Sequence, residues 1–480
     1  MRYLMMLEKI LKKYRKYVVL VDPRISRYVR AEKELKLALA LSPASLTPVI
    51  LYYVRLLDAD LTVVASLSAL LLVSSAFRVL ETLTSVSSIN KKLDDELPFA
   101  VLAATAASKT GLEFIEFLKF VSTSRVFKSF KSLGERFVKL AEIVGVAEAL
   151  TTLSRITSGK TKYFLIEYSV ALNSGTALSQ LRDYASDFMK TISSQITRSI
   201  SFRVNAGITT CVGLTIGPLV ALSITFLVGE ELTSFVVPLL VLAGFLTTSL
   251  FPDYPVGLQA VIDEKLLKVF RASYVAGTAL LVFPLQHLIE GDVAGFTRCL
   301  QQASVASLVL GLLPATLQLR AVLNTVVGRV VSRASNHVRV FRSLQLYEDR
   351  ELEETLKKRV RSWLILYLSE ALAFLKQLGD CDPEVFEVFV NFVYEVRRTL
   401  WQYIAALTIM TSVIFLAPFL IASTATLGCE LASLTNTLLV SYTSLLVLGY
   451  SVSKIVLGKN LSTTYPALTT LIFTVFTPIK

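Results

Sequence analysis

The sequence predicts an all-α, polytopic membrane protein with about nine helical spans and two large cytoplasmic helical blocks. Runs of about 18 or more apolar residues recur along the 480-residue chain, 53% of which is hydrophobic. Charged residues make up 18% of the chain, below the roughly 25% typical of soluble domains. They are concentrated in blocks between the apolar runs, and breakers within these blocks separate segments of helical period.

Residues 1–36 are basic, with eleven Lys and Arg against four Asp and Glu. Leu4, Leu7, Leu11 and Tyr14 share one helical face, and lysines occupy the others. This pattern predicts an amphipathic cytoplasmic helix that can lie on the membrane surface. It does not predict a signal peptide, because no apolar segment with a small-residue cleavage site follows the charges.

The remaining chain alternates between apolar and polar regions. Residues 37–80 are expected to hold two membrane spans, 81–203 a cytoplasmic bundle, 204–319 four spans, 320–401 a second cytoplasmic block and 402–480 two to three spans. The individual spans are expected at about Leu37–Val54, Leu61–Phe77, Val204–Val228, Phe235–Phe251, Ala272–Ile289, Leu300–Leu319, Tyr403–Leu427 and Leu431–Val452. The ninth and least clearly marked span is expected at Leu461–Thr477.

The positions of the basic residues orient these spans. The formal net charge is +12, and nearly all Lys and Arg lie in residues 1–36, 81–203, 252–271 and 320–401. Basic loops stay in the cytoplasm, where they can contact anionic lipid headgroups. We therefore expect the N-terminus and both large blocks to be cytoplasmic in a multi-pass cell-membrane protein. Acids are interleaved with the bases instead of leaving a basic stripe, which argues against nucleic-acid binding. The opposite loops carry Asp58, Asp60, Glu230, Glu231, Glu290, Asp292 and Glu430.

The block over residues 81–203 is expected to contain about six short helices. An acidic run, Asp94-Asp95-Glu96-Leu97-Pro98, is predicted to open the first helix, with Pro98 in its first turn. Gly111, Gly145 and Gly175 mark turns between helices. After Thr176 no Gly or Pro occurs before Gly207. The last helix of the bundle and the third span are therefore predicted to form one helix of about 40 residues, roughly 60 Å long.

The two halves of the chain share a plan. Pro218 and Pro418, both predicted kinks within apolar spans, are 200 residues apart, as are Glu230 and Glu430. The alternative is coincidence, since many apolar spans contain a proline and end in an acid. Asp382-Pro383-Glu384 is a strong helix start in the second half.

Motifs for catalysis or cofactor binding are missing from the sequence. Residues 154–161 end in Gly-Lys-Thr like a phosphate-binding loop, but serine occupies position 154 and the segment joins two helices. The four cysteines and two histidines show no metal-ligand spacing. No Asp, Glu, Lys or Arg lies well inside an expected span, which argues against an ion-coupled transporter. We therefore expect no enzyme activity, cofactor or metal.

Several short motifs follow one another in a distinctive order between Leu93 and Arg203. They are Glu96-Leu97-Pro98, Lys109-Thr110-Gly111-Leu112, Gly145 before Ala147-Glu148-Ala149-Leu150, and Asn173-Ser174-Gly175-Thr176-Ala177-Leu178 followed by Leu181 and Ala185. In this order the block resembles the GspF-type domain of type II secretion and type IV filament assembly, in the archaeal TadC/FlaJ-like branch. The second block matches only in layout, because it lacks a clear Ser-Gly-x-x-Leu step.

The resemblance implies a membrane platform protein with a six-helix GspF-type bundle and no catalytic site. Such proteins dock a cytoplasmic hexameric secretion ATPase, pass pilin-like subunits from the bilayer into a filament and form small homo-oligomers. The basic residues of the first block are the best candidates for the ATPase contact, although a solvated or headgroup-facing surface explains them more simply. An alternative function is a multispan transporter or permease subunit, and an intramembrane enzyme ranks third. The candidate contact residues are Lys109, Lys119, Arg125, Lys128, Lys131, Arg136 and Lys139.

Overall fold

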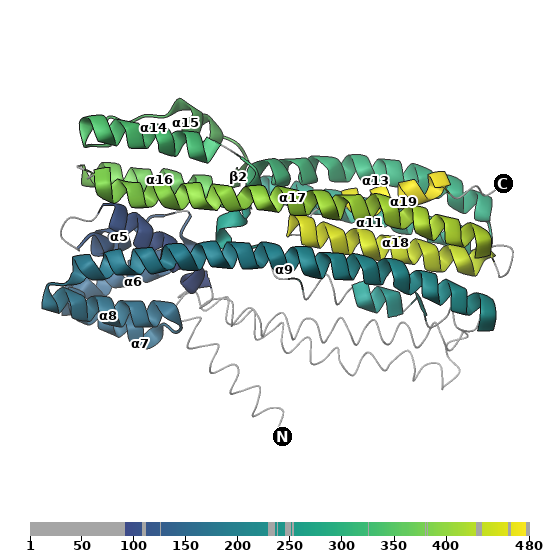
Figure 1. Cartoon of the computed structure of the whole chain (residues 1–480), viewed down its shortest axis with the longest axis horizontal. Helices are drawn as coiled ribbons and strands as arrows, with labels where there is room; N and C mark the ends of the chain where they lie inside the picture. The colour runs from purple at the N-terminus through teal and green to yellow at the C-terminus, as the bar shows by residue number, and fades with distance from the viewer. Residues whose placement is uncertain are drawn as a thin grey trace, which may run out of the picture. The chain divides into compact units, whose positions relative to one another are not determined.

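The computed structural model confirms the all-α class for the residues it describes, which also include one pair of three-residue strands (Figure 1). These residues divide into two compact units. The first holds the described residues of Met1–Ile192 with Ser332–Tyr347 and Tyr367–Phe392, and the second holds those of Ser193–Val331, Glu348–Leu366 and Val393–Lys480. The described ranges are 92–107, 112–124, 126–228, 236–237, 239–244, 251, 254–324, 326–379, 381, 383–428, 434–458 and 462–476.

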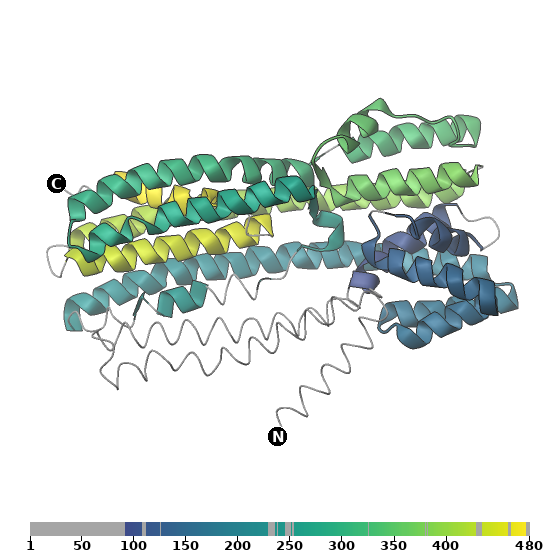
Figure 2. The same cartoon turned by 180° about the vertical axis from the view of Figure 1, so that it is seen from behind.

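The first unit is a helical bundle. Its first described residues, 92–106, are helical, and α6, α7 and α8 run alongside one another (Figures 1 and 2). α6 ends at Gly145 (φ 84°) and α8 at Gly175 (φ 75°), backbone conformations that other residues rarely adopt. The elements are α5 (Glu113–Val121), α6 (Lys128–Val144), α7 (Val146–Ile156), α8 (Lys160–Ser174) and parts of α9 (Ala177–Val228), α14 (Val326–Phe341), α16 (Trp363–Leu378) and α17 (Pro383–Gly428).

Aromatic packing joins both expected cytoplasmic blocks in the core of this unit. The ring of Phe99 lies 5.1 Å from that of Tyr367 and 5.5 Å from that of Phe392, and the Tyr367 hydroxyl donates to the Phe99 carbonyl at 3.1 Å. Phe117 and Phe374 are 5.2 Å apart. Edge-on contacts of this kind stabilise a core beyond the area they bury. Residues 367–392 therefore pack with residues 92–130 in one core.

The second unit is built from apolar helices that pack closely. α11, α13, α18 and α19 run side by side (Figure 1). A Cβ on Gly311 of α13 would lie 2.5 Å from the Thr464 nitrogen of α19, so the backbones approach too closely for any side chain there. Its further elements are η2 (Val256–Leu258), β1 (Ala260–Ile262), α11 (Glu264–Val282), α12 (Leu285–Ile289), α13 (Val293–Val322), α15 (Arg350–Leu356), β2 (Val360–Ser362), α18 (Leu434–Leu457) and α19 (Thr464–Phe476).

The strands β1 and β2 pair in antiparallel register, with Val261 opposite Arg361. The Arg361 guanidinium also donates to the Asp263 carboxylate at 2.9 Å and to the Leu356 carbonyl at 2.8 Å. This pairing fixes the loop that precedes α11 to the polar segment that precedes α16.

Two long helices, α9 and α17, carry the repeated plan. α9 has 52 residues and α17 has 46, so they are about 78 and 69 Å long at 1.5 Å per residue. The predicted continuous helix beyond Thr176 is confirmed by α9. Each of the two helices passes from residues of the first unit to residues of the second.

The described residues hold fewer membrane-spanning helices than the nine that the sequence predicts. Among the described residues, three helices are long and apolar enough to cross a membrane, within Glu264–Leu288, Val293–Phe341 and Thr437–Leu457. The expected span at Leu461–Thr477 corresponds to α19, whose 13 residues reach only about 20 Å of the roughly 30 Å hydrocarbon core. The apolar stretch in α17 is also shorter, at Ile414–Ala425. The two expected spans before residue 80 lie outside the described residues.

Candidate functional site

The acidic run near the start of the first unit stabilises a helix other than its own. Glu96 is buried, and its carboxylate accepts the backbone N–H groups of Ser129 at 3.0 Å and Phe130 at 3.1 Å. These are N–H groups of the first turn of α6, where a carboxylate complements the helix dipole. Burial raises the pKa of Glu96 to about 7, although the two N–H bonds and nearby Lys92 oppose that rise.

Asp94 stabilises the first turn of α8 in the way that Glu96 stabilises that of α6. Its carboxylate accepts the Thr161 N–H and hydroxyl, both at 2.8 Å. Gly159 precedes this turn with φ 73°, and a Cβ there would lie 2.1 Å from an Asp94 oxygen. The Asp94 carboxylate therefore lies at the N-terminus of α8, beside the Gly-Lys-Thr segment. A phosphate-binding loop would hold its phosphate at the same position.

This arrangement differs from the predicted local helix start. Residues 92–97 are already helical, and Pro98 is buried within the helical residues 92–106 instead of lying in a first turn. Glu370 of α16 adds a third carboxylate, which accepts the Ser124 hydroxyl and the Val126 N–H just before α6. Acids from two neighbouring helices thus fix the position of α6.

The predicted basic residues fall on two helices. α6 buries Phe130, Leu133 and Phe137 and turns its opposite face outward, with Lys128 and Lys139 exposed. Lys131 and Arg136 are half-buried on the flanks of that face, and burial lowers the pKa of the Arg136 guanidinium. Lys119 on α5 pairs with Glu116 at 2.8 Å. Lys109, Arg125 and the predicted turn residue Gly111 lie outside the described residues.

The predicted turn and kink residues are placed as follows. Gly145 separates α6 from α7, and Gly175 ends α8. Pro418 lies inside α17, and residue 218 lies within the bounds of α9. Neither proline ends its helix.

Exposed apolar side chains on α6, α7 and α8 were not anticipated from the sequence. Ile143, at the end of α6, is 79% exposed, and Tyr163 and Val170 on α8 are 65% and 62% exposed. The sequence does contain a signal for them. Tyr163, Ile166 and Val170 follow helical spacing on a face of α8 other than the buried face of Phe164 and Tyr168.

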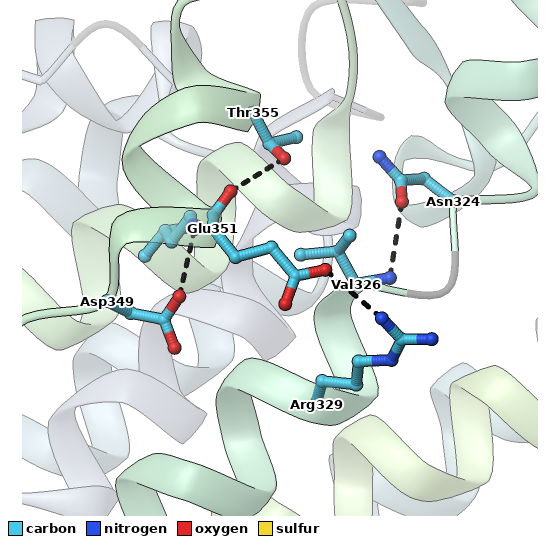
Figure 3. A network of polar contacts seen from close by, with 7 residues as sticks. Asn324, Val326, Arg329, Asp349, Glu351 and Thr355 are labelled. Atoms are coloured by element: carbon cyan, nitrogen blue, oxygen red, sulfur yellow. Dashed lines mark hydrogen bonds and ion pairs between the residues drawn. The ribbon is translucent and has the colours of Figure 1, made fainter.

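A polar network orders the region around α14 and α15 (Figure 3). Arg329 of α14 approaches the Glu351 carboxylate at 3.4 Å, and Asp349 caps α15 by accepting the Leu352 N–H at 3.0 Å. Thr355 donates to the Glu351 carbonyl at 2.8 Å. These contacts position the short helix α15, and none of them pairs a general base with a nucleophile.

Arg203 and a small cavity lie at the C-terminal end of α18. The Arg203 guanidinium donates to the Ile455 carbonyl at 3.0 Å and lies 3.8 Å from the Tyr254 ring centre, so a cation meets the negative end of the helix dipole. The adjoining cavity, of about 20 Å³, is lined by Gln318, whose buried amide nitrogen has no hydrogen-bond partner among the described residues. It has room for about one water molecule. The described residues contain no cluster that could hold a metal ion.

Comparisons of the chain with protein-family models, with curated proteins and with solved structures find no match. The described part of the first unit presents exposed basic side chains on α6 and exposed apolar side chains on α6, α7 and α8.

Proposed function

We propose that this chain is the integral membrane platform of a type IV pilus-like or type II secretion system. In this role it docks a cytoplasmic hexameric secretion ATPase and couples it to the insertion of pilin-like subunits into a filament. The bundle over residues 81–203 is then a GspF-type bundle of the TadC/FlaJ-like branch, cytoplasmic together with the N-terminus. The platform acts as a small homo-oligomer.

The observation that carries the proposal is the continuity of α9 and α17. Each helix runs without a break through the residues that the structure describes, over 52 residues in α9 and 46 in α17, and α17 includes the apolar stretch Ile414–Ala425. A helix without a break transmits a displacement along its axis, which is what a platform needs if a motor on one side is to act in the bilayer.

Two measurements on cells and on the purified protein test the proposal. The full-length protein in nanodiscs should bind the purified hexameric secretion ATPase of the same cells. Cells that lack the chain should lose a surface filament or a secreted product. The competing function, a transporter or permease subunit, predicts that small-molecule uptake is lost while filaments persist and the ATPase does not bind. That result would overturn the proposal.

A further inference from the structure

The C-terminal end of α18 is held by side chains from other parts of the second unit. The last carbonyl groups of a helix have no partner within it, and in α18 these include the carbonyls of Ile455 and Val456. The Tyr254 hydroxyl donates to both, at 3.0 and 2.7 Å, and the Arg203 guanidinium of α9 donates to that of Ile455 at 3.0 Å. Gly458, just beyond the helix, has φ 71°, and a Cβ there would overlap the Tyr254 ring.

Arg203 is a buried cation, with 2% of its surface exposed. Its guanidinium lies 3.8 Å from the centre of the Tyr254 ring. Charge-assisted hydrogen bonds and cation–π contacts are both stronger where water is excluded than at a surface. A buried guanidinium that loses such contacts carries a large desolvation cost. Arg203 and the last turn of α18 therefore move together more easily than they separate.

The Arg203 contact differs in kind from the apolar packing beside it. Leu214 of α9 and Ile455 of α18 belong to one apolar cluster, and Val204 packs against that cluster. Apolar contacts have no preferred direction, so packed helices can slide a little along each other. A hydrogen bond depends on both distance and angle. The bond from Arg203 therefore fixes the axial position of α9 against α18 in a way that apolar packing alone does not.

The position of Arg203 suits the transfer of a movement into the membrane. It is the last residue of the first polar block, and the expected span Val204–Val228 of α9 follows it. Its partner helix α18 is enclosed by protein and packs against α12, α13 and α19. Among the candidate spans of the described residues, 78% of the apolar segment of α18 is buried, against 17% within Glu264–Leu288 and 33% within Val293–Phe341. A movement at the end of α18 is therefore passed on to several helices.

We propose that Arg203 is the residue through which an axial displacement of α9 reaches the buried helix α18, an inference that rests on the function proposed above. Arg203 is a positioning residue in this role. When the ATPase displaces the preceding part of α9, the guanidinium draws the Ile455 carbonyl and the last turn of α18 with it. Tyr254 supports the contact, because its ring lies against the guanidinium and its hydroxyl binds the same carbonyl.

The test compares variants of the full-length protein in nanodiscs, with the purified hexameric ATPase and ATP as the probe. Arg203→Met removes the charge and the donors but keeps a side chain of similar length. Replacing a buried ion by an apolar group of similar volume often preserves stability, and Tyr254 still donates to the Ile455 carbonyl. The matched control is Arg198→Met, the same change at an exposed position of α9.

Two readouts follow the movement and its result. Hydrogen exchange of the last turn of α18 is measured with the bound ATPase, with and without ATP, and filament assembly or secretion is measured in cells. We expect ATP to change this exchange in the wild type and in Arg198→Met. Arg203→Met should abolish the change and prevent assembly or secretion, while its Kd for the ATPase and its thermal midpoint remain those of the wild type.

A second variant separates coupling from stability. Tyr254→Phe keeps the ring beside the guanidinium and removes the hydroxyl, so two carbonyl groups of α18 lose a hydrogen bond. It should lower the thermal midpoint more than Arg203→Met does and still respond to ATP. If the response is lost in Tyr254→Phe and kept in Arg203→Met, the contact only stabilises α18, and the inference is overturned.

The remaining outcomes distinguish the inference from the proposed function. A normal exchange response and normal assembly in Arg203→Met would overturn the inference alone. Loss of ATPase binding in this variant would also overturn it, because Arg203 would then act in docking. If the wild type does not bind the ATPase, both proposals are wrong. If Arg203→Met does not fold, Arg203→Lys decides, since an ammonium keeps the charge but lacks the planar fork: loss of the response supports the inference, and a wild-type response contradicts it.

Discussion

Replacing Glu96 by Gln tests whether a buried carboxylate fixes the start of α6. Glu96 accepts two N–H groups of α6, and burial raises its pKa from 4.5 to about 7. The folded protein therefore binds more protons than the unfolded chain between these two pH values. Its stability falls as pH rises through this window, and the fall is complete above about pH 7. Gln keeps an acceptor for the N–H groups and cannot ionise.

The size of the effect follows from the pKa rise. At about 1.4 kcal/mol per unit, the wild type loses about 3 kcal/mol between pH 4.5 and pH 8 that Glu96→Gln does not lose. The assay is hydrogen exchange of the α6 amides and the unfolding free energy of the full-length protein in micelles, across that range. The relevant quantity is the difference in unfolding free energy between the wild type and Glu96→Gln, because all other titrating groups contribute equally to both proteins.

Two results would refute this reasoning. A difference that does not change with pH would show that Glu96 does not titrate in this window. A wild type that gains stability relative to Glu96→Gln as pH rises would show that the N–H bonds outweigh burial. Glu96→Ala serves as a control. It leaves two helix N–H groups without their acceptor, so it should be less stable than Glu96→Gln by about 1 to 3 kcal/mol at every pH in this range.

Two pairs of glycine variants test the close approaches in each unit. Gly145→Ala should lose about 1 to 2 kcal/mol of unfolding free energy because of its positive φ, whereas Gly159→Ala should lose more because its Cβ also displaces Asp94. Equal losses would contradict the Asp94 contact. Gly311→Ala should lower the thermal midpoint because its Cβ meets the backbone of α19, while Gly213→Ala, with open space around its Cβ, should not. Equal midpoints for the two would contradict the packing of α13 on α19.

Local signals predicted parts of this fold. Gly145 and Gly175 end their helices with positive φ, as glycines at breakers commonly do. The lack of Gly and Pro after Thr176 predicted the unbroken helix α9. These features depend on backbone conformation within a few residues, which the sequence specifies directly.

These local signals did not show which distant segment each side chain contacts. Asp94 and Glu96 were assigned to the start of their own helix, because N-terminal acids usually act there, but the structure uses them for α8 and α6. The spacing of aromatic residues around Tyr367 shows which face of α16 is buried, yet it does not show that Phe99 covers that face. Hydropathy also overcounted spans, because it registers Leu461–Thr477 as apolar without showing that helix α19 covers 13 of the residues described there.

The exposed apolar side chains of α8 were missed for a related reason. Helical spacing of Tyr163, Ile166 and Val170 is indistinguishable in sequence from a second buried stripe. Only the packing of Phe164 and Tyr168 shows which face of α8 is inside. The candidate contact residues were therefore the basic side chains on the solvated face of α6, and not the exposed apolar side chains of α8.

The central claim is that unbroken helices couple a cytoplasmic motor to the bilayer, and an insertion into α9 tests it most directly. A flexible Gly-Ser segment between Arg198 and Val204 interrupts this helix. The same segment inserted after Leu346, in an exposed loop, is the control. The account predicts that the α9 insertion abolishes filament assembly or secretion while the protein remains in the membrane and binds the ATPase, and that the loop insertion is tolerated. Normal assembly with the α9 insertion would contradict it.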